Sequence, residues 1–354
     1  MKPLRTALIG AGSIAQSHMR ALEGVQEIEV VAVADIIRER AETTAQKWKI
    51  PHIYEDYHEM LAVEDIEAVS VLTYNQAHRA PTVDALHAGK HVLVEKPMAA
   101  TLADAAAMTR AAHETGKMLM TAVWTRFSAH RKAAKTIMTS GALGDIYYAE
   151  CVAARRCGMP GGSFIRKETA GIGTVADIGV YCLDEALHLM GHPKPVSVSA
   201  ISNNILSKNY TPILGVTHWG GEFSPDLLTV EDFGVAWVRF EDGAALVFKT
   251  CWAMHMDNIG GTFFLGTKGG LKLNPLTLFR FENGLMTDTV VPNIPPTDPP
   301  ALFRQENLAF AAAIREGQPS PIPPEELLLT NVIIQGLVDS SAAGREIQVS
   351  MPEV

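Results

Sequence analysis

The chain has 354 residues, of which 47% are hydrophobic and 19% charged, and its formal net charge is −9. This length favours two domains, and the negative charge argues against non-specific binding to nucleic acids or to anionic membrane surfaces. No apolar run reaches the roughly 18 residues that a membrane span needs. The four cysteines are scattered without a C-x-x-C pair, which predicts reduced thiols in a cytoplasmic protein and neither a disulfide framework nor a metal site.

A glycine-rich turn follows the first predicted strand. Residues 4–9 form a short apolar run, and Gly10-Ala11-Gly12-Ser13-Ile14-Ala15 leads from it into a predicted helix over 14–22. In such a turn the first glycine permits a tight bend and the second lets the backbone approach a pyrophosphate. The helix N-terminus adds N–H groups and a positive dipole. The pattern predicts a dinucleotide site that includes Gly10, Gly12, Ser13 and Ile14.

A second predicted strand, over residues 28–34, ends in Asp35. An acid at this distance from the glycine turn typically bonds the hydroxyls of the adenosine ribose. Its carboxylate would repel a 2′-phosphate, which favours NAD, whereas Arg38 and Arg40 nearby keep NADP possible. A role as a helix cap or turn residue is the structural alternative for Asp35.

Strands and helices continue to alternate up to residue 122. Further strands are predicted over 67–72, 91–94 and 118–122, with helices over 79–88 and 101–115. This alternation is typical of a doubly wound parallel sheet. Polar residues at 73–78, 95–97 and 124–127 each follow one of these strands. Because ligands bind at the carboxyl ends of such strands, we expect these three clusters on the ligand side of the sheet.

The pattern changes beyond residue 144, where β-rich runs with alternating polarity replace the α/β units. Glu241-Asp242-Gly243 is a predicted hairpin turn between two of the runs. Helices are predicted over 303–316 and 323–344. The second half therefore predicts an α+β domain with a mostly antiparallel sheet. Its strands are predicted over 146–154, 196–206, 230–240, 244–253, 261–266, 271–273 and 276–282.

One stretch of the second half carries polar residues at helical spacing. Read as one helix, residues 171–188 place Asp177, Tyr181, Asp184 and His188 in a single stripe between apolar faces. Buried polar groups destabilise a fold unless they are paired or functional. The structural alternative is that Thr174 and Asp177 form an N-terminal cap and that His188 makes a core hydrogen bond.

Four motifs together resemble one family. The glycine turn, Glu95-Lys96-Pro97, the helix that contains Asp177 and Gly266-Thr267-Lys268-Gly269-Gly270 occur in this order. The set resembles the glucose-fructose oxidoreductase, inositol dehydrogenase and rhizopine-catabolism (Gfo/Idh/MocA) family over the whole chain. The resemblance implies a Rossmann domain for NAD or NADP over 1–124. It also implies a substrate-binding domain over 125–354, whose large open sheet forms a homodimer or homotetramer.

The resemblance also implies the reaction and its residues. Family members transfer a hydride between the nicotinamide and a secondary hydroxyl or carbonyl of a sugar, glycoside or cyclitol such as inositol. Carried onto this chain, the catalytic residues are Lys96, Asp177 and Tyr181, and Pro97 follows a cis peptide bond. A tyrosine with a pKa of about 10 needs a neighbouring cation to act as a base near neutrality. Lys96 is the candidate cation, and whether Lys96 or Tyr181 carries the proton stays open.

Further residues are predicted to line the two halves of the site. For the cofactor these are Thr73, Asn75, His78, Glu95 and Lys96, and for the substrate they are Lys96, Arg126, Asp177, Tyr181 and His188. Two other functions stay open on the same fold. One is a dehydrogenase of a non-sugar carbonyl or dihydrodiol, for which we expect an aromatic-lined pocket. The other is a non-catalytic regulator that senses a dinucleotide or a sugar.

Overall fold

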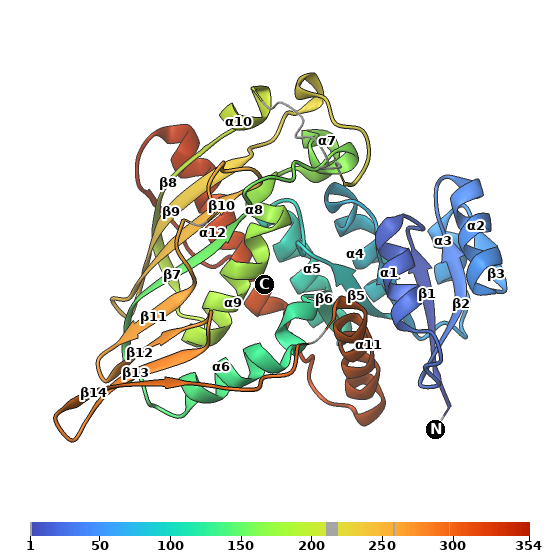
Figure 1. Cartoon of the computed structure of the whole chain (residues 1–354). Helices are drawn as coiled ribbons and strands as arrows, with labels where there is room; N and C mark the ends of the chain where they lie inside the picture. Colours follow the sequence, from blue (N-terminus) through green and yellow to red (C-terminus); the bar gives the residue numbers. More distant parts are fainter. Residues whose placement is uncertain (1, 210–218, 258, 297) are drawn as a thin grey trace. The chain divides into compact units, whose positions relative to one another are not determined.

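The computed structural model describes residues 2–209, 219–257, 259–296 and 298–354 (Figure 1). The chain divides into two compact units, each built on its own β-sheet. The first unit comprises Met1–Phe127, Thr297–Leu328 and Pro352–Val354. The second comprises Ser128–Pro296 and Leu329–Met351. The two units are described separately below.

The first unit contains a six-stranded parallel sheet in the order β3-β2-β1-β4-β5-β6. This order is that of a doubly wound dinucleotide-binding sheet, so the predicted fold of the first half is confirmed. Its strands are nearly continuous apolar runs, as expected where helices cover both faces of a sheet. Their bounds are β1 (Leu4–Ile9), β2 (Ile28–Ala34), β3 (His52–Tyr54), β4 (Ala68–Val71), β5 (His91–Glu95) and β6 (Leu119–Ala122).

One helix of the first unit comes from far along the chain. α11 begins after Asp298, whose side chain accepts a hydrogen bond from the N–H of Ala301, and it contacts α1. Arg304 donates to the carbonyl of Ala21 at 2.8 Å, and Arg315 pairs with Glu67 at 2.6 Å. The helices of the unit are α1 (Ser13–Ala21), α2 (Arg38–Trp48), α3 (Tyr57–Leu61), α4 (Arg79–His87), α5 (Leu102–Thr115) and α11 (Pro299–Glu316), with 3-10 turns η1 (Asn75–Ala77) and η2 (Trp124–Phe127).

The second unit contains a nine-stranded sheet in the order β14-β13-β12-β11-β7-β10-β9-β8-β15. Only β7 and β10 pair in parallel, so the prediction of a large, mostly antiparallel sheet is confirmed. The bounds are β7 (Ile146–Ala154), β8 (Pro195–Asn203), β9 (Phe233–Phe240), β10 (Ala245–Cys251), β11 (Phe263–Gly266), β12 (Gly269–Lys272), β13 (Thr277–Glu282), β14 (Leu285–Val290) and β15 (Ile347–Gln348).

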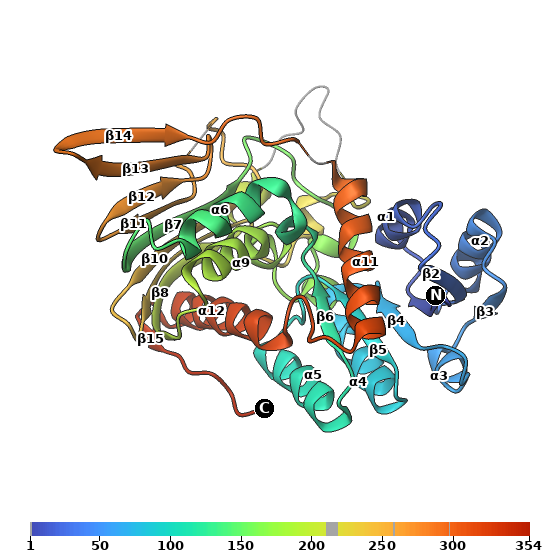
Figure 2. The ribbon, with the colours of Figure 1, turned by 90° about the horizontal axis from the view of Figure 1, so that it is seen from below.

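Helices cover one face of this sheet, as Figure 2 shows for α6, α9 and α12. The core between them includes the fully buried side chains of Leu183, Leu187, Leu246, Phe248 and Ile333. The helices of the unit are α6 (Ala129–Thr139), α7 (Lys167–Ala170), α8 (Thr174–Asp177), α9 (Gly179–Met190), α10 (Ile205–Lys208) and α12 (Pro324–Ala343, from Leu329 onward), with 3-10 turns η3 (Gly162–Phe164) and η4 (Pro225–Leu227).

Two predicted elements of the second unit need correction. The strand predicted over 196–206 ends at Asn203, and residues 205–208 form the short helix α10. The single helix predicted over 171–188 is broken, because α8 ends at Asp177 and α9 begins at Gly179. A Cβ on Gly179 would lie 2.7 Å from the Phe248 ring, so this position packs too closely against the sheet for any larger residue.

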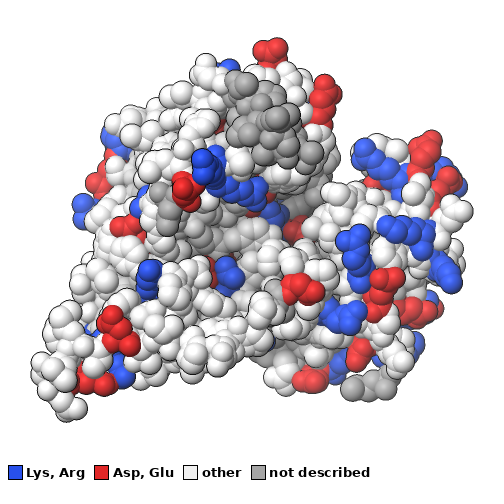
Figure 3. Space-filling view, in the orientation of Figure 1, with Lys and Arg blue, Asp and Glu red and all other residues white. Residues whose placement is uncertain are grey.

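Charge is unevenly distributed on the face shown in Figure 3. Basic and acidic side chains are interspersed over the first unit, whereas large areas of the second unit carry neither. Among the helices in the described residues, none combines the length and the apolar character that crossing a membrane would require.

Candidate active site

The glycine turn of the first unit leaves space for a phosphate group. Gly10 has φ +98°, and a Cβ there would lie 2.6 Å from the carbonyl oxygen of Leu72. Gly12 precedes α1, no side chain caps that helix, and a Cβ on Gly12 would meet nothing within 4 Å. Ser13 and Ile14 form the first turn of α1. An uncapped helix N-terminus beside open space fits the pyrophosphate of a dinucleotide.

Asp35 ties the glycine turn to the end of β2. Its Oδ2 accepts a hydrogen bond from the N–H of Ala11 at 2.8 Å, and its Oδ1 accepts one from Ile37 at 2.9 Å. Asp35 therefore has the turn-stabilising role that the sequence left open as an alternative. Each carboxylate oxygen can accept a second hydrogen bond, so this role is compatible with binding a ribose hydroxyl. Arg38 pairs with Glu42 at 2.8 Å.

Thr73, Asn75 and His78 follow β4, as predicted, but His78 lies below the surface. The His78 ring is fully buried, with Nδ1 2.9 Å from the carbonyl oxygen of Pro97 and Nε2 3.2 Å from that of Thr73. Burial lowers the pKa of His78, which favours the neutral imidazole, and the single N–H of that form can donate to only one of these two carbonyl oxygens. The His78 ring thus lies between the loop after β4 and the loop after β5.

Glu95 is the last residue of β5 and belongs to a hydrogen-bonded chain. It is 4% exposed, and its Oε2 accepts from the N–H of Lys96 at 3.0 Å. Its Oε1 lies 3.0 Å from Nε2 of His18 in α1. The Asn307 amide nitrogen lies 3.1 Å from Nδ1 of His18 and donates to the Phe303 carbonyl at 2.8 Å. Because an amide nitrogen can only donate, Nδ1 accepts and Nε2–H donates to Glu95.

Glu306, on α11, is a second buried carboxyl near the hydrogen-bonded residues Glu95, His18 and Asn307. Its side chain is fully buried, and within the described structure neither carboxyl oxygen has a hydrogen-bond partner. Burial raises the pKa of Glu306 well above its ordinary range, and the charge of Glu95 raises it further. Both effects favour the protonated form of Glu306. No sequence motif indicated His18, Glu306 or Asn307.

The other predicted residues of the first unit lie on its loops. Lys96 is partly buried directly after β5, and the Lys96–Pro97 peptide bond is cis, as the resemblance predicted. Arg126, predicted for the substrate, lies in η2 and forms an ion pair with Glu326.

Asp177 is the central polar residue of the second unit. It is 6% exposed at the C-terminus of α8, and its Oδ2 accepts a hydrogen bond from Nε1 of Trp252 at 2.9 Å. Trp252 is fully buried and directly follows β10. No sequence motif indicated this contact of Trp252 with Asp177.

The start of α8 is held by Glu231. The cap by Thr174, which the sequence left open as an alternative, is not formed, because Gly173 precedes the helix and the Thr174 hydroxyl lies 3.1 Å from that of Thr250. Oε1 of Glu231 accepts hydrogen bonds from the N–H groups of Gly173 at 2.8 Å and Val175 at 3.2 Å. Burial raises the pKa of Glu231 to about 7. No sequence motif indicated this contact.

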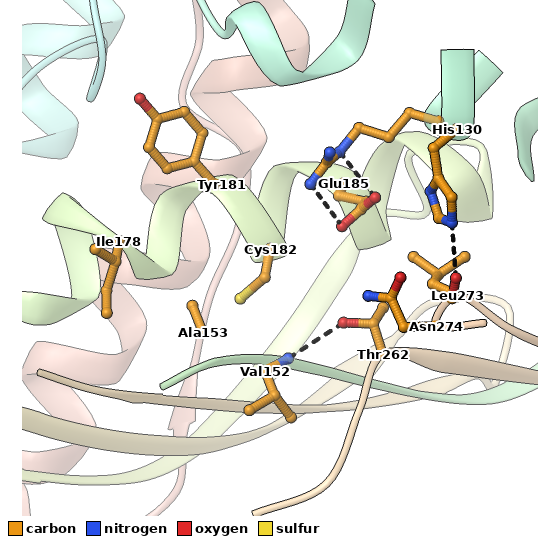
Figure 4. A pocket seen from close by; sticks show the side chains of 11 residues that line it. His130, Val152, Ala153, Ile178, Tyr181, Cys182, Glu185, Thr262, Leu273 and Asn274 are labelled. Atoms are coloured by element: carbon orange, nitrogen blue, oxygen red, sulfur yellow. Dashed lines mark hydrogen bonds and ion pairs between the residues drawn. The ribbon is translucent and has the colours of Figure 1, made fainter. Parts of the chain in front are cut away.

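Tyr181 lines a cavity of about 350 Å³ in the second unit. Its ring projects from α9 with the hydroxyl pointing away from Cys182 and Ala153 (Figure 4). Glu185, one turn further along α9, forms an ion pair with Arg131 at 2.8 Å. Burial raises the pKa of Glu185, although Arg131 opposes this. The lining is completed by His130, Val152, Ala153, Ile178, Cys182, Thr262, Leu273 and Asn274.

This cavity presents several polar groups suited to hydroxyl groups. Thr262 accepts from the N–H of Val152 at 3.4 Å, and His130 lies 2.7 Å from the carbonyl oxygen of Leu273 (Figure 4). A concave site with a few oriented polar groups is typical of a small-molecule pocket. His188 is not among the lining residues; its ring lies in the last turn of α9, 5.6 Å from that of His192.

Comparisons with known proteins agree with this architecture. The family model described as "Oxidoreductase family, NAD-binding Rossmann fold" matches residues 4–123, and the "GFO/IDH/MocA C-terminal domain" matches residues 131–272. The D-glucoside 3-dehydrogenase of Escherichia coli (strain K12) is 34% identical over 290 residues, which are 80% of this chain and 81% of that protein.

A more distant relative and a solved structure extend this picture. The trans-1,2-dihydrobenzene-1,2-diol dehydrogenase of Homo sapiens is 28% identical over 254 residues, which are 70% of this chain and 75% of that protein. The structure of levoglucosan dehydrogenase in complex with NADH has a TM-score of 0.83 at 21% identity and covers 99% of this chain and 100% of its own. At this identity the structure supports the fold alone.

Proposed function

The chain belongs to the GFO/IDH/MocA family of NAD-binding oxidoreductases, and we propose that it transfers a hydride between NAD and a secondary hydroxyl or carbonyl of a sugar, glycoside or cyclitol. The observation that carries the substrate class is the polar cavity lined by Tyr181. The curated relative that covers four fifths of this chain is a D-glucoside dehydrogenase. Residues 1–124 would bind the cofactor and residues 125–354 the substrate.

We propose that the cofactor is held by the residues predicted from the sequence, with NAD preferred over NADP. The open space beside Gly12 and the uncapped N-terminus of α1 suit the pyrophosphate. Asp35 repels a 2′-phosphate, and Arg38, the cation best placed in sequence to bind one, is paired with Glu42. Thr73, Asn75, Glu95 and Lys96 complete the assignment on loops at the carboxyl ends of β4 and β5.

Lys96, Asp177 and Tyr181 are proposed to act on the substrate, with Arg126 and His188 as further substrate contacts. NAD, when bound, would supply the acceptor for the hydride of the alcohol. Proton removal falls to the protein, and a tyrosine does this near neutrality only if a cation favours its phenolate. Lys96 would supply that charge and, in the reverse direction, stabilise the developing alkoxide. Asp177, whose carboxylate accepts a hydrogen bond from Trp252, would orient the reacting hydroxyl.

A panel of aldoses, pyranosides and cyclitols tests this function. Each compound is incubated with NAD and, separately, with NADP, and the absorbance of the reduced nicotinamide is followed. We expect turnover of at least one sugar class, faster with NAD than with NADP. A trans-dihydrodiol serves as the competing substrate, and its exclusive oxidation would reassign the substrate class. Among the described residues that line the cavity, Tyr181 is the single Tyr, Phe or Trp, which disfavours an aromatic diol.

Replacing Tyr181 with phenylalanine separates the two possible bases. If the phenol carries the proton, Tyr181→Phe lowers kcat by about 100-fold, the usual contribution of a positioned acid or base. The ring is retained, so the cavity wall and the KM for the substrate should change little. Steady-state kinetics on the best sugar of the panel measures both constants. An unchanged kcat would give the proton-transfer role to Lys96 alone.

We further propose that the protein is a homo-oligomer, assembled through the uncovered face of the second sheet, and that it acts in the cytoplasm. Large apolar side chains lie on this sheet away from the helices, among them Ile201, Trp237 and Phe281, which are 61%, 38% and 77% exposed. Large apolar side chains exposed along one sheet support a protein interface there. The four cysteines are free thiols, as in a reducing compartment. Analytical ultracentrifugation that finds only monomer at micromolar concentration would contradict the assembly.

A further inference from the structure

Glu231 and Asp232 are neighbours in the sequence, and both make contacts that hold Asp177. Glu231 contacts the start of α8, and Asp232 contacts Trp252, the hydrogen-bond partner of Asp177. On the upstream side, three successive N–H groups end on Glu231. Those of Gly173 and Val175 reach its Oε1, and that of Thr174 reaches its carbonyl oxygen at 3.0 Å. On the downstream side, the carbonyl oxygen of Asp232 accepts from the N–H of Trp252 at 3.1 Å, and the Trp252 indole donates to Asp177.

α8 depends on these external acceptors. It has four residues and no side-chain cap of its own, and a helix this short is not stable in isolation. The approach to Glu231 is close: a Cβ on Gly173 would lie 2.0 Å from the Glu231 carbonyl oxygen, so only glycine fits there. Contacts with Glu231 and Asp232 thus contribute to the position of Asp177 at the end of α8, together with the hydrogen bond from the Thr250 hydroxyl to the Thr174 carbonyl at 3.2 Å.

We propose that Glu231 is a positioning residue for the reaction, which acts by fixing α8 and hence the orientation of Asp177. This inference rests on the proposed function, in which Asp177 orients the reacting hydroxyl. Glu231 fixes the start of α8, and Trp252, held by the neighbouring Asp232, fixes the Asp177 carboxylate directly. Loss of the Glu231 carboxylate leaves the N–H groups of Gly173 and Val175 without these acceptors and lets the first turn of α8 shift.

The charge of Glu231 gives this contact a pH dependence. Burial raises the pKa of Glu231 to about 7, the N–H groups of Gly173 and Val175 oppose the rise, and Asp232 adds to it. Asp232 is itself held by the N–H and hydroxyl of Ser207, and burial raises its pKa as well. The elements packed here also carry Asp177 on α8, Arg239 on β9, and Lys249 and Cys251 on β10. Lys249 pairs with Glu150 at 2.6 Å, and burial raises the pKa of Cys251 to about 11. Above neutral pH Glu231 is ionised and accepts its two hydrogen bonds more strongly.

Two substitutions at Glu231 and one control test the proposal on the intact protein. Glu231→Ala removes the acceptor and should lower kcat by about 10- to 100-fold with an unchanged KM for NAD, because small misplacements at a reacting centre have effects of this size. Glu231→Gln keeps one oxygen in the same place and should recover kcat to within about threefold of the wild type, while the ionisation near pH 7 disappears from the pH profile of kcat.

Thr229→Val is the control. The Thr229 hydroxyl accepts from the N–H of Lys167 at the start of α7, so it holds a neighbouring helix in the same way. The kcat of Thr229→Val should equal that of the wild type.

A second measurement works without turnover. The Trp252 indole N–H resonance, assigned by its loss in Trp252→Phe, reports on the hydrogen bond to Asp177. In the wild type it should shift with pH around 7; the shift should vanish in Glu231→Gln, and the resonance should be displaced in Glu231→Ala. Normal kcat in Glu231→Ala, or an indole resonance that ignores both substitutions, would overturn the proposal. If the resonance responds but Asp177→Asn keeps full activity, Glu231 still fixes α8 and the proposed function fails instead.

Discussion

Replacing Lys96 with methionine should remove most turnover while leaving NAD binding measurable. Methionine matches the length and the apolar stem of lysine but carries no ammonium group. In the proposed reaction this cation favours the phenolate of Tyr181 and stabilises the developing alkoxide, so its loss affects the transition state in both directions. We expect kcat to fall by about 100-fold or more. Steady-state kinetics gives kcat, and titration of NADH fluorescence gives the affinity for the cofactor.

Lys90→Met is the matched control for this substitution. Lys90 precedes β5, at the opposite end of the strand from Lys96, and is 6% exposed. Its Nζ donates to the carbonyl of Val63 at 2.8 Å. The control therefore also removes a buried ammonium group, but one whose partner is a backbone carbonyl outside the candidate site. We expect Lys90→Met to lower the melting temperature and to keep kcat close to normal. A near-normal rate in Lys96→Met, or an equal loss in both variants, would contradict the catalytic assignment.

The strands that sequence predicted best are those with the sharpest apolar boundaries. β1, β2 and β7 begin and end at the predicted residues, because each apolar or alternating run stops at a turn or a charged residue. β14 was missed, since nearly all of its side chains are exposed and its sequence, Leu-Met-Thr-Asp-Thr-Val, has no buried face to set a period. The break between α8 and α9 was missed because the residues on both sides of it follow one helical spacing, and the close approach of Phe248 to Gly179 involves another element.

The residues of the candidate site also fall into a group that the sequence predicted and a group that it did not. The glycine turn and Asp35 were predictable, since they lie within one βαβ unit whose spacing is fixed by local geometry. The contacts of Glu95 were not, because His18 lies 77 residues away along the chain, and Asn307 lies 289 residues from His18. Glu231 is likewise 58 residues from the Gly173 N–H that it accepts. Polar contacts between distant segments leave no periodic pattern in the sequence.

Glu306→Gln should raise the stability of the protein at alkaline pH and change it little in acid. A glutamate in an unfolded chain has a pKa near 4.5, whereas in the folded protein burial and then the charge of Glu95 raise the pKa of Glu306 well above it. The folded state therefore holds a proton that the unfolded state releases. The contribution of this proton to the free energy of unfolding is fully present below pH 4.5. It is lost as the pH rises from 4.5 to the pKa of Glu306 in the folded state, by about 1.4 kcal/mol for each pH unit. Glutamine has the same shape and no proton to lose.

Melting temperatures measured at one scan rate between pH 5 and pH 9 test this expectation. The wild type and Glu306→Gln should be similar at pH 5 and diverge by several degrees at pH 8.5, with the variant the more stable. Other groups with raised pKa values, such as Glu185 and Glu231, keep some pH dependence in both proteins. Glu316→Gln is the control, because Glu316 is an exposed carboxyl on the same helix, and its curve should follow the wild type. Parallel curves for Glu306→Gln and the wild type would mean that Glu306 is ionised in the fold, as a second buried anion near Glu95.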